Sequence, residues 1–300
     1  MMKASSVQKA IASIFGESVR ITDKYPVYGG DINQSYRLSL SNGVSVFLKI
    51  NTPKNMSFFS AEASGLEALQ AVDVIGVPKP LAFGIDEKRK VSFLLMEYLE
   101  AAPKLSGYWE TFGRELAALH CADSRGFAGF NDSMPFGFAS DNYIGANLQR
   151  NTPKQNWITF FRECRLLPQM RMAERYFDSR TRGQCAKLLD HLDHYLSEPA
   201  FPSLIHGDLW SGNTVCGPDG KAWILDPAAY VGHFEAELAM TELFGGYPGS
   251  FYGAYHEINP IDSAYRDRKE LYNLYHLLNH LNLFGGSYLS AVMRILNRYI

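Results

Sequence analysis

The sequence predicts an α+β fold in two lobes: a small N-terminal lobe with an antiparallel sheet and one helix, and a larger, mostly helical C-terminal lobe. Three observations predict it. Residues 1–98 contain short strand-like runs separated by turn residues, with a long amphipathic segment among them. Residues 99–300 contain mainly segments with helical spacing of apolar residues. The composition changes at Ala101-Ala102-Pro103, which marks the boundary between the lobes.

The length and charge of the chain limit its function classes. Its 300 residues, 46% of them hydrophobic, are enough to bury a large core and to divide into two lobes. The 29 basic and 31 acidic residues give a net charge of −2, which provides no attraction for nucleic acid or an acidic membrane. No apolar run approaches the roughly 20 residues that span a bilayer, and the N-terminus lacks the pattern of a signal peptide. We therefore expect neither a nucleic-acid nor a membrane partner.

The four cysteines indicate a reducing compartment. They are Cys121, Cys164, Cys185 and Cys216, far apart in sequence and without a C-x-x-C pair or an accompanying histidine cluster. This pattern supports neither a disulfide scaffold nor a zinc site. We expect a soluble cytoplasmic protein that is a monomer or a weak homodimer.

The first lobe is expected to begin with a helix within residues 1–15 and a strand at 20–26. Residues 27–38 then indicate a strand, a turn and a second strand. Gly29 and Gly30 in that turn permit a close approach of the backbone, so N–H groups could face phosphate oxygens. The structural alternative is an ordinary hairpin turn, which most Gly-Gly pairs form.

A lysine in an apolar strand is the next informative feature. Residues 44–50 alternate around Lys49, and a buried lysine is costly unless it is paired. Lys49 is either an edge-strand lysine facing water or the lysine that contacts nucleotide phosphates in kinases. The amphipathic segment 58–72 offers Glu62, beside its apolar stripe, as the ion-pair partner, and Glu67 is expected on the solvated face.

Two further strands, 81–85 and 91–96, complete the predicted sheet, and the chain then leaves it. The exit segment indicates a hinge between lobes whose backbone groups could bind the edge of an adenine. The hinge residues are Glu97, Tyr98 and Leu99.

The second lobe is expected to contain helices at 108–121, 157–175 and 183–195. His120 ends the first of them, where a structural C-terminal cap is the favoured interpretation. The segment 125–155 has many aromatic residues, which favours an ordered loop bordering the substrate cleft over a disordered linker.

The stretch His206-Gly-Asp208-Leu-Trp-Ser-Gly-Asn213 carries the chemistry. Asp208 and Asn213 have the spacing of the aspartate and asparagine in a kinase catalytic loop. Asp226 ends a short apolar strand, where a kinase places its metal-binding aspartate. A polar turn between two strands is the structural alternative. Three matching elements in the right order favour a kinase-like site.

Phosphoryl transfer explains these residue types. The Asp208 carboxylate would orient a substrate hydroxyl and accept its proton. The Asn213 amide oxygen and the Asp226 carboxylate would hold Mg²⁺ against the triphosphate. The sequence therefore predicts a protein kinase-like fold that uses ATP and Mg²⁺.

Polar residues downstream of this stretch have two interpretations each. Glu235 and Glu237 near a helix start are expected to complement the helix dipole. In the segment 268–284, four polar side chains either line a sugar pocket or satisfy one another between helices, and the second interpretation is favoured. They are His276, Asn279, His280 and Asn282.

Together these motifs resemble the fructosamine kinase (ketosamine 3-kinase) family, within the aminoglycoside phosphotransferase and choline kinase-like superfamily, over nearly the whole chain. The H-G-D-x-x-x-x-N core marks only the superfamily. More specific are the W-S-G-N form, Asp-Pro in place of D-F-G, and the runs G-H-x-E-x-E-L-A-M from Gly232 and N-H-L-N-L-F-G from Asn279.

The resemblance implies ATP-dependent phosphorylation of the 3-hydroxyl of a sugar ketoamine, a step of deglycation or metabolite repair. It implies that Asp208 is the catalytic base, that Asn213 and Asp226 bind Mg²⁺, and that Lys49 contacts phosphates while Glu62 braces it. The residues implied to cover the nucleotide are Gly29, Gly30, Ile32, Asn33 and Gln34, with Glu97, Tyr98 and Leu99 as the hinge.

On the substrate side, Trp210 is expected to be an apolar plate against the sugar, the alternative being a core tryptophan. His206 and His233 are further candidate substrate residues. Asp31 stands where some relatives carry a cysteine, so a thiol switch is not expected there. Phe234 stands where relatives usually carry an arginine, so any contact that this arginine makes in relatives is not expected in this chain.

Two other function classes remain open. A kinase of the same fold could act on another small alcohol, such as an aminoglycoside or choline, and a cleft rich in carboxylates would support it. A non-catalytic nucleotide-binding module is the other, although the complete set of Lys49, Asp208, Asn213 and Asp226 argues against it. The sequence leaves open whether the acceptor is a free sugar amine, a glycated amino acid or a glycated protein.

Overall fold

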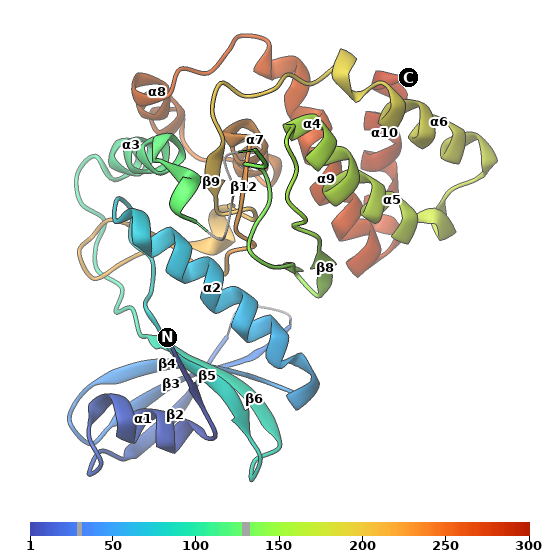
Figure 1. The fold of residues 1–300 in the computed structure, drawn as a ribbon. Helices are drawn as coiled ribbons and strands as arrows, with labels where there is room; N and C mark the ends of the chain where they lie inside the picture. Colours follow the sequence, from blue (N-terminus) through green and yellow to red (C-terminus); the bar gives the residue numbers. More distant parts are fainter. Residues whose placement is uncertain (29–31, 128–132) are drawn as a thin grey trace. The chain divides into compact units, whose positions relative to one another are not determined.

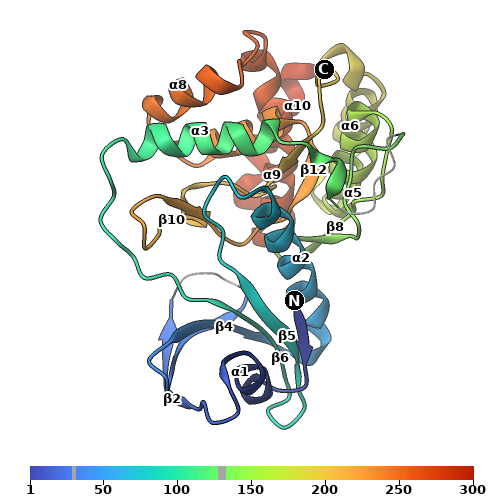
Figure 2. The same cartoon turned by 60° about the vertical axis from the view of Figure 1, so that its left-hand side comes forward.

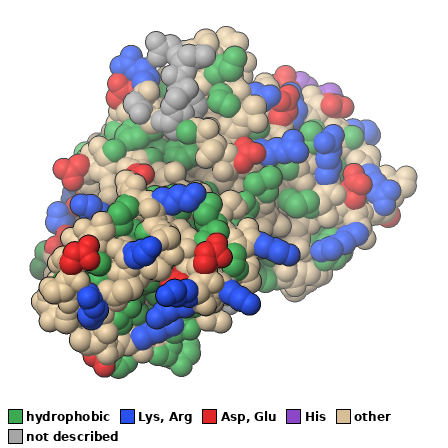
Figure 3. Space-filling view, turned by 60° about the horizontal axis from the view of Figure 1, so that its bottom comes forward, with side chains coloured by type: hydrophobic (Ala, Val, Ile, Leu, Met, Phe, Trp, Pro, Cys, Tyr) green, Lys and Arg blue, Asp and Glu red, His purple; other side chains and the backbone are tan. Residues whose placement is uncertain are grey.

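The computed structural model describes residues 1–28, 32–127 and 133–300 (Figure 1). Among these residues, no helix combines the length and the apolar character required to cross a membrane. Basic and acidic side chains are interspersed over the face shown in Figure 3. The expectation that nucleic acid is not a partner stays a prediction.

Contacts divide the chain into two units. The first unit is Met1–Tyr108 together with Val215–Pro227, and the second is Trp109–Thr214 together with Ala228–Ile300. The predicted lobes, 1–98 and 99–300, are a functional division that this grouping of contacts does not test. The grouping does show that the strand before Asp226 packs with the N-terminal part of the chain, although it follows the H-G-D stretch in sequence.

A six-stranded sheet forms the first unit, in the order β1-β5-β6-β4-β3-β2. Its strands are β1 (Met2–Ala4), β2 (Ile21–Val27), β3 (Gln34–Leu40), β4 (Ser45–Asn51), β5 (Pro80–Asp86) and β6 (Val91–Glu97). Neighbouring strands are antiparallel except for β1 and β5, which are parallel. The predicted antiparallel strands are therefore present, and the sheet gains one short edge strand that the sequence did not predict.

The predicted helix within residues 1–15 is present, and a short strand that the sequence did not predict precedes it. The helix α1 (Val7–Phe15) begins only after β1, because the hydroxyl of Ser6 caps it by accepting from the N–H of Lys9 at 3.2 Å. Figures 1 and 2 place α1 and α2 (Met56–Val72) on opposite faces of the sheet. Apolar side chains of α1 pack against alternate residues of the strands, and this cluster includes Ile11, Leu38 and Leu48.

The segment before Asp226 joins the first unit through a tight contact. The strands β10 (Thr214–Cys216) and β11 (Ala222–Ile224) form a hairpin, and Trp223 makes an isolated bridge to Gly76. A Cβ atom at Gly76 would lie 2.5 Å from the Trp223 ring, so only glycine allows this approach. The N–H of Ile224 also donates to the carbonyl of Gly76 at 2.9 Å.

The second unit is mostly helical. Its helices are α3 (Tyr108–Cys121), α4 (Trp157–Phe160), a π-helical segment (Phe161–Leu166), α5 (Leu167–Met172), α6 (Ser179–Asp190), α7 (Phe234–Leu243), α8 (Gly249–Ile258), α9 (Tyr265–Phe284) and α10 (Leu289–Tyr299). Two antiparallel pairs accompany them: β7 (Asn142–Ile144) with β8 (Asn147–Gln149), and β9 (Ser203–Ile205) with β12 (Tyr230–Gly232). Short 3₁₀ turns lie at Pro53–Asn55, Ser124–Gly126, Glu174–Tyr176, Leu192–His194, Ser211–Asn213 and Gly286–Tyr288.

The helix expected at 157–175 is not continuous, because a π-helical segment interrupts it. Arg165 lies in that segment and is fully buried. Its guanidinium donates to the carbonyl of Arg150 at 2.5 Å and to Asn151 Oδ1 at 2.8 Å, and it lies 3.8 Å from the centroid of the Tyr230 ring. The wider turn fits these contacts, which a sequence pattern cannot anticipate.

Part of the aromatic-rich segment 125–155 forms the hairpin β7–β8. This hairpin is fixed to the backbone that follows Asp226. Asn142 Nδ2 donates to the carbonyl of Ala229 at 2.8 Å, and Gln149 Nε2 donates to the carbonyl of Ala228 at 2.9 Å.

Candidate active site

Lys49 on β4 lies at the centre of a buried ion cluster in the first unit. The residue is 5% exposed, and its Nζ lies 2.6 Å from Oε1 of Glu62 on α2. A second ion pair joins Lys49 to Asp226. Glu67, by contrast, pairs with the N-terminal amine at the surface, at 2.9 Å. The structure therefore contains the predicted ion pair, with the predicted choice of glutamate.

Charge outweighs burial for the pKa of Lys49 but not for that of Glu62. Burial by itself lowers the pKa of Lys49, but the carboxylates of Asp226 and Glu62 overcome it and hold that pKa above its usual range. Burial raises the pKa of Glu62, and the negative charge of Asp226 adds to this, while Lys49 opposes both. Lys49 therefore stays a cation at neutral pH, and removal of a partner would leave an uncompensated buried charge.

Asp226 combines an unusual backbone with an accessible side chain. Its φ is +56°, in the left-handed region that aspartate tolerates better than most residues. Its side chain is 49% exposed in spite of the ion pair to Lys49. A strained residue held by its surroundings is a feature of functional sites, and an exposed carboxylate is suited to binding a cation.

The predicted phosphate-covering loop is described only in part. Gly29, Gly30 and Asp31 lie outside the described residues, so the predictions of phosphate contacts and of no thiol switch at these positions stay predictions. The remainder of the loop is described from Ile32 onward.

Asn51 fastens the described end of this loop to β4. Its Nδ2 donates to Oδ1 of Asn33 at 2.7 Å and to the carbonyl of Ile32 at 3.3 Å. Gln34 begins β3, and its Oε1 accepts from the hydroxyl of Tyr36 at 3.0 Å. The sequence analysis missed Asn51, although its place two residues after Lys49 on the same strand was a usable indication.

The predicted hinge follows the end of β6. The N–H of Glu97 donates to the carbonyl of Lys79 at 2.9 Å, and its carboxylate accepts from the N–H of Lys79 at 3.2 Å. The guanidinium of Arg37 lies 4.7 Å from the centroid of the Tyr98 ring. Leu99 follows beyond the paired residues of the sheet. The hinge is therefore anchored at its first two residues.

In the second unit, Asp208 lies in a loop that is closed by its own hydrogen bonds. The Nδ2 of Asn213 donates to the carbonyl of Asp208 at 2.8 Å and to Asp208 Oδ2 at 3.2 Å. Gly207 has a φ of +82°, and a Cβ atom there would lie 2.3 Å from the carbonyl oxygen of Ala228. The Asp208 side chain is half-buried. Asn213 therefore limits the rotation of the carboxylate predicted to act as the base.

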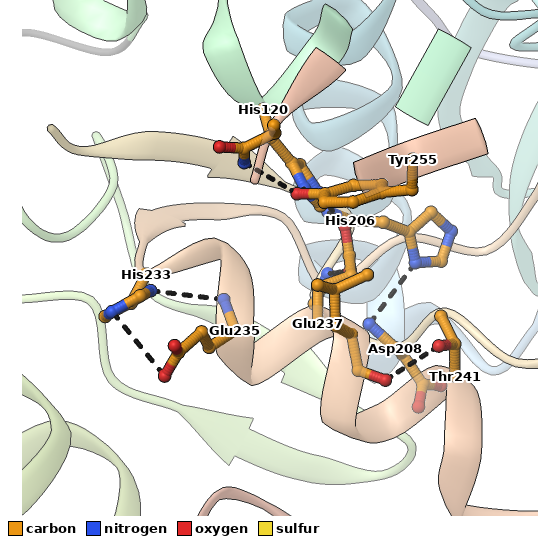
Figure 4. Close-up of polar contacts among 11 residues, drawn as sticks. His120, His206, Asp208, His233, Glu235, Glu237, Thr241 and Tyr255 are labelled. Atoms are coloured by element: carbon orange, nitrogen blue, oxygen red, sulfur yellow. Dashed lines mark hydrogen bonds and ion pairs between the residues drawn. The ribbon is translucent and has the colours of Figure 1, made fainter. Parts of the chain in front are cut away.

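Glu237 on α7 accepts hydrogen bonds from the backbone of the same loop (Figure 4). Its Oε2 accepts from the N–H of His206 at 2.9 Å, and its Oε1 accepts from the N–H of Gly207 at 2.7 Å. The residue is 1% exposed. Burial raises the pKa of Glu237, but the hydrogen bond and charge of His120 and the neighbouring His206 hold it below its usual value. A buried carboxylate thus fixes the backbone immediately before Asp208.

A chain of hydrogen bonds continues from Glu237 through α3 to α8. His120 Nε2 lies 3.0 Å from Glu237 Oε2, and His120 Nδ1 lies 2.7 Å from the hydroxyl of Tyr255. Asn259 Nδ2 donates to that hydroxyl at 2.9 Å. One assignment satisfies every group: Asn259 donates to Tyr255, Tyr255 donates to Nδ1, and Nε2–H donates to Glu237.

These contacts add to three interpretations of the sequence. His120 lies in the last turn of α3 and has a structural role, as predicted, but its ring bonds Glu237 and Tyr255 and does not cap its own helix. Glu235 and Glu237 lie in the first turn of α7, where they complement the helix dipole as predicted, and Glu237 in addition accepts from the backbone of His206 and Gly207. Glu235 is also buried, and its carboxylate binds the guanidinium of Arg268 at 2.6 and 2.8 Å. The sequence could not show which helices pass beneath the loop.

The two candidate substrate histidines are buried. His206 is 0% exposed, and its Nδ1 accepts from the N–H of Asp208 at 3.2 Å. His233 is 4% exposed, and its Nδ1 caps α7 by accepting from the N–H of Glu235 at 3.1 Å. Burial, followed by the charges of Arg268 and His120, lowers the pKa of His233 to about 3. This geometry favours positioning roles over contact with a substrate.

Trp210, two residues after Asp208, is 37% exposed, so it is not the core tryptophan that the sequence left as an alternative. Phe234, at the position where the resemblance led us to note the lack of an arginine, makes apolar contacts. Its ring packs against His233 at 4.8 Å and Phe201 at 6.1 Å between centroids, and it is 8% exposed.

The comparison with known proteins agrees with the motifs. Residues 2–300 match the model of the fructosamine kinase family. The chain belongs to the fructosamine kinase family. A probable ketoamine kinase of Synechocystis sp. is 40% identical over 294 residues, which are 98% of this chain and 95% of that protein. A chloroplastic protein-ribulosamine 3-kinase of Oryza sativa subsp. indica is 38% identical over 288 residues, covering 95% of this chain and 81% of that protein.

Solved structures confirm the protein kinase-like fold class. The crystal structure of a candidate fructosamine-3-kinase of Haemophilus somnus has a TM-score of 0.85 and 29% identity, covering 98% of this chain and 97% of the other. An aminoglycoside phosphotransferase has a TM-score of 0.61 at 17% identity, covering 97% of this chain and 99% of that one, and this likeness concerns the fold alone. The family member described here is an ATP-dependent kinase, and its likeness to relatives of other substrate classes does not favour those substrates.

The donor chemistry of this fructosamine kinase family member suits Mg²⁺. In the part of the chain that is described, no group of three or more His, Cys, Asp or Glu side chains could hold a metal ion. The predicted Mg²⁺ ligands are instead one amide, Asn213, and one carboxylate, Asp226. Both are hard oxygen donors, and Mg²⁺ bound with a nucleotide takes its remaining ligands from phosphate and water.

Proposed function

We propose that this member of the fructosamine kinase family transfers the γ-phosphoryl group of ATP to the 3-hydroxyl of a sugar ketoamine of the fructosamine or ribulosamine type. The step would serve deglycation or metabolite repair. The observation that carries the proposal is the fixed Asp208 loop: Asn213 binds the carboxylate, and Glu237 binds the backbone beside it.

Asp208 would orient the acceptor hydroxyl and receive its proton as the oxygen attacks phosphorus. Such a base gains from a fixed geometry, because a hydroxyl and a phosphoryl group must meet in line. The half-buried position of Asp208 leaves it partly accessible to solvent, so an acceptor could reach it. Trp210 would provide an apolar face against the sugar ring.

Residues of the first unit would bind the nucleotide. Lys49 would contact phosphates with Glu62 as its brace, and the loop and hinge would cover the triphosphate and the adenine. The loop and hinge residues are Gly29, Gly30, Ile32, Asn33, Gln34, Glu97, Tyr98 and Leu99. We assign Mg²⁺ to Asn213 and Asp226; when bound, it would offset the negative charge of the triphosphate.

We place this reaction in the cytoplasm, because all four cysteines are free thiols. Plant relatives are named chloroplastic, so the compartment is not common to every relative. The expectations of a monomer or weak homodimer, and of no nucleic-acid or membrane partner, belong to the same proposal.

The decisive test is ATP consumption with a panel of acceptors: fructosamines, ribulosamines, the parent ketoses, choline and an aminoglycoside. Ketoamines should be the best acceptors, and NMR of the product should locate the phosphate on O3. Asp208→Asn should lose turnover by about two to four orders of magnitude while it still binds nucleotide, because only the proton acceptor is removed. Absence of turnover with every ketoamine, or full activity of Asp208→Asn, would overturn the proposal.

A further inference from the structure

A row of aromatic rings begins at the catalytic loop of the second unit and ends at its surface. The Trp210 ring lies 6.0 Å from Phe244, and Phe244 lies 4.9 Å from His280, both measured between ring centroids. His280 in turn contacts Phe284 at 5.5 Å and Tyr288 at 5.1 Å. We call these five residues the aromatic row. They come from the loop, the end of α7, the last turns of α9 and the turn that follows α9.

The aromatic row is not core packing. Trp210 is 37% exposed and Phe284 is 53% exposed, so both ends reach solvent. Another aromatic cluster of this unit lies around Trp157 and Phe160, and both of these residues are 0% exposed. Contiguous exposed aromatic surface is unfavourable in water and marks ligand-binding grooves in soluble proteins.

His280 places a hydrogen-bond acceptor in the middle of the row. Its Nδ1 lies 2.8 Å from the carbonyl oxygen of His276, so Nδ1 must carry the proton and donate. In the neutral ring, Nε2 is then an acceptor, and within the described residues it makes no hydrogen bond. Burial lowers the pKa of His280, partly opposed by that backbone bond, so the ring is neutral at pH 7.

We propose that the aromatic row is the subsite for the amine-linked arm of the ketoamine. The sugar would lie on Trp210, the secondary ammonium would donate to Nε2 of His280, and the arm would lie along Phe284 and Tyr288. This inference rests on the proposed function and specifies which part of the acceptor the enzyme recognises beyond the sugar.

The chemistry of the acceptor fits this order of rings. The nitrogen of a ketoamine is bonded to C1, two carbons from the 3-hydroxyl, so it lies within the length of one sugar from Asp208. Its ammonium carries a positive charge and two N–H donors, which aromatic faces and a neutral imidazole both bind well. A free ketose has no group to place beyond Trp210. The row should therefore select ketoamines over ketoses and favour apolar or aromatic arms.

The test compares fructosamines that share one sugar and differ in the arm: methyl, butyl and phenylethyl. In the wild-type enzyme, kcat/KM should rise from methyl to phenylethyl. In Phe284→Ala, the ratio of kcat/KM for phenylethyl to that for methyl should fall by about tenfold, the size of one aromatic contact. Tyr25→Ala on β2 is the matched control, because Tyr25 is 54% exposed and belongs to the other unit, and it should leave this ratio unchanged.

His280→Phe tests the ammonium contact, because it keeps an aromatic ring and removes the acceptor. KM should rise by a similar factor for all three fructosamines, with kcat retained, and an unchanged KM would contradict the contact. The subsite as a whole is overturned if wild-type kcat/KM is independent of the arm, or if Phe284→Ala keeps the wild-type ratio. Failure of the proposed function looks different, because the wild-type enzyme would then phosphorylate no fructosamine at all.

Discussion

Lys49 in the first unit and Glu237 in the second are both buried charges, but they bind different kinds of partner. Lys49 forms ion pairs with two side chains, Glu62 and Asp226, and all three are themselves predicted to act in nucleotide or metal binding. Glu237 binds the backbone N–H groups of His206 and Gly207, and the side chain predicted to act, Asp208, stays outside its contacts.

Because their partners differ, the Lys49 cluster and the Glu237 contacts should respond differently when a ligand binds. Side chains that neutralise one another must be shared with an incoming phosphate or cation, so the Lys49 cluster should respond to ligands. Backbone groups held by Glu237 have no such competitor, and the loop can stay fixed through the reaction. The first unit would therefore combine stability and the predicted function in the same residues, whereas the second would separate them.

The largest expected effect is that of Lys49→Met. It leaves Glu62 and Asp226 as neighbouring carboxylates without a cation, and it should lower the free energy of unfolding by about 3–5 kcal/mol as well as abolish turnover. Urea denaturation measures the first effect and ATP consumption the second. A double variant, Lys49→Met with Glu62→Leu, should regain most of the stability, since an apolar pair can replace a buried ion pair. Recovery of activity in the double variant would contradict the phosphate role of Lys49.

Glu237→Ala should have a smaller effect on stability and a selective effect on rate. It leaves the N–H groups of His206 and Gly207 buried without an acceptor, which should lower the free energy of unfolding by about 1–3 kcal/mol. The value of kcat should fall while KM for ATP stays near wild type, because the predicted nucleotide residues belong to the other unit. Glu257→Ala is the control: its side chain is 57% exposed and pairs with Arg114, so the change should stay within about 0.5 kcal/mol. An unchanged kcat in Glu237→Ala would show that the loop keeps its geometry without this carboxylate.

The two clusters also differ in how far sequence predicts them. The Lys49–Glu62 pair was predictable because each residue breaks a local pattern, a cation in an apolar strand and a glutamate beside the apolar stripe of a helix. Glu237 was missed because it reaches its partners only through the packing of α7 beneath the loop. A glutamate near a helix start has an adequate local explanation, and nothing in the pattern distinguishes a buried one.

The fold shows the same division between local and distant causes. Strands β3 to β6 follow from alternation and turn residues, and α2 follows from its apolar stripe. The interruption near Arg165 and the joining of Trp223 to Gly76 depend on partners about 15 and 147 residues away, and no local pattern encodes them. The H-G-D loop could be proposed as a catalytic loop from sequence because phosphoryl transfer would require its residue types at that spacing.

Acid should destabilise the second unit more than the first, because all eight histidines of the chain belong to the second. Burial, followed by neighbouring positive charge, lowers the pKa of both His233 and His276 to about 3. The unfolded chain therefore binds more protons between pH 6.5 and pH 3, so this stability is fully present above pH 6.5 and is lost as the pH falls through that window. Burial raises the pKa of Glu62 in the first unit. Its contribution to stability is therefore present at low pH and lost as the pH rises, which is the opposite pH dependence.

Hydrogen exchange can follow the two units separately in one sample. Protection of amides in α7 and α9 should fall on acidification from pH 6.5 to pH 4, ahead of protection in β3 and β4. His233→Asn keeps an oxygen that can cap α7 and removes the titration. This variant should reduce the slope of the free energy of unfolding of the second unit against pH by about 1.4 kcal/mol per pH unit. His194→Asn, at an exposed position, should leave that slope unchanged. Equal slopes in these two variants would mean that protonation of His233 does not limit the stability of the second unit in acid.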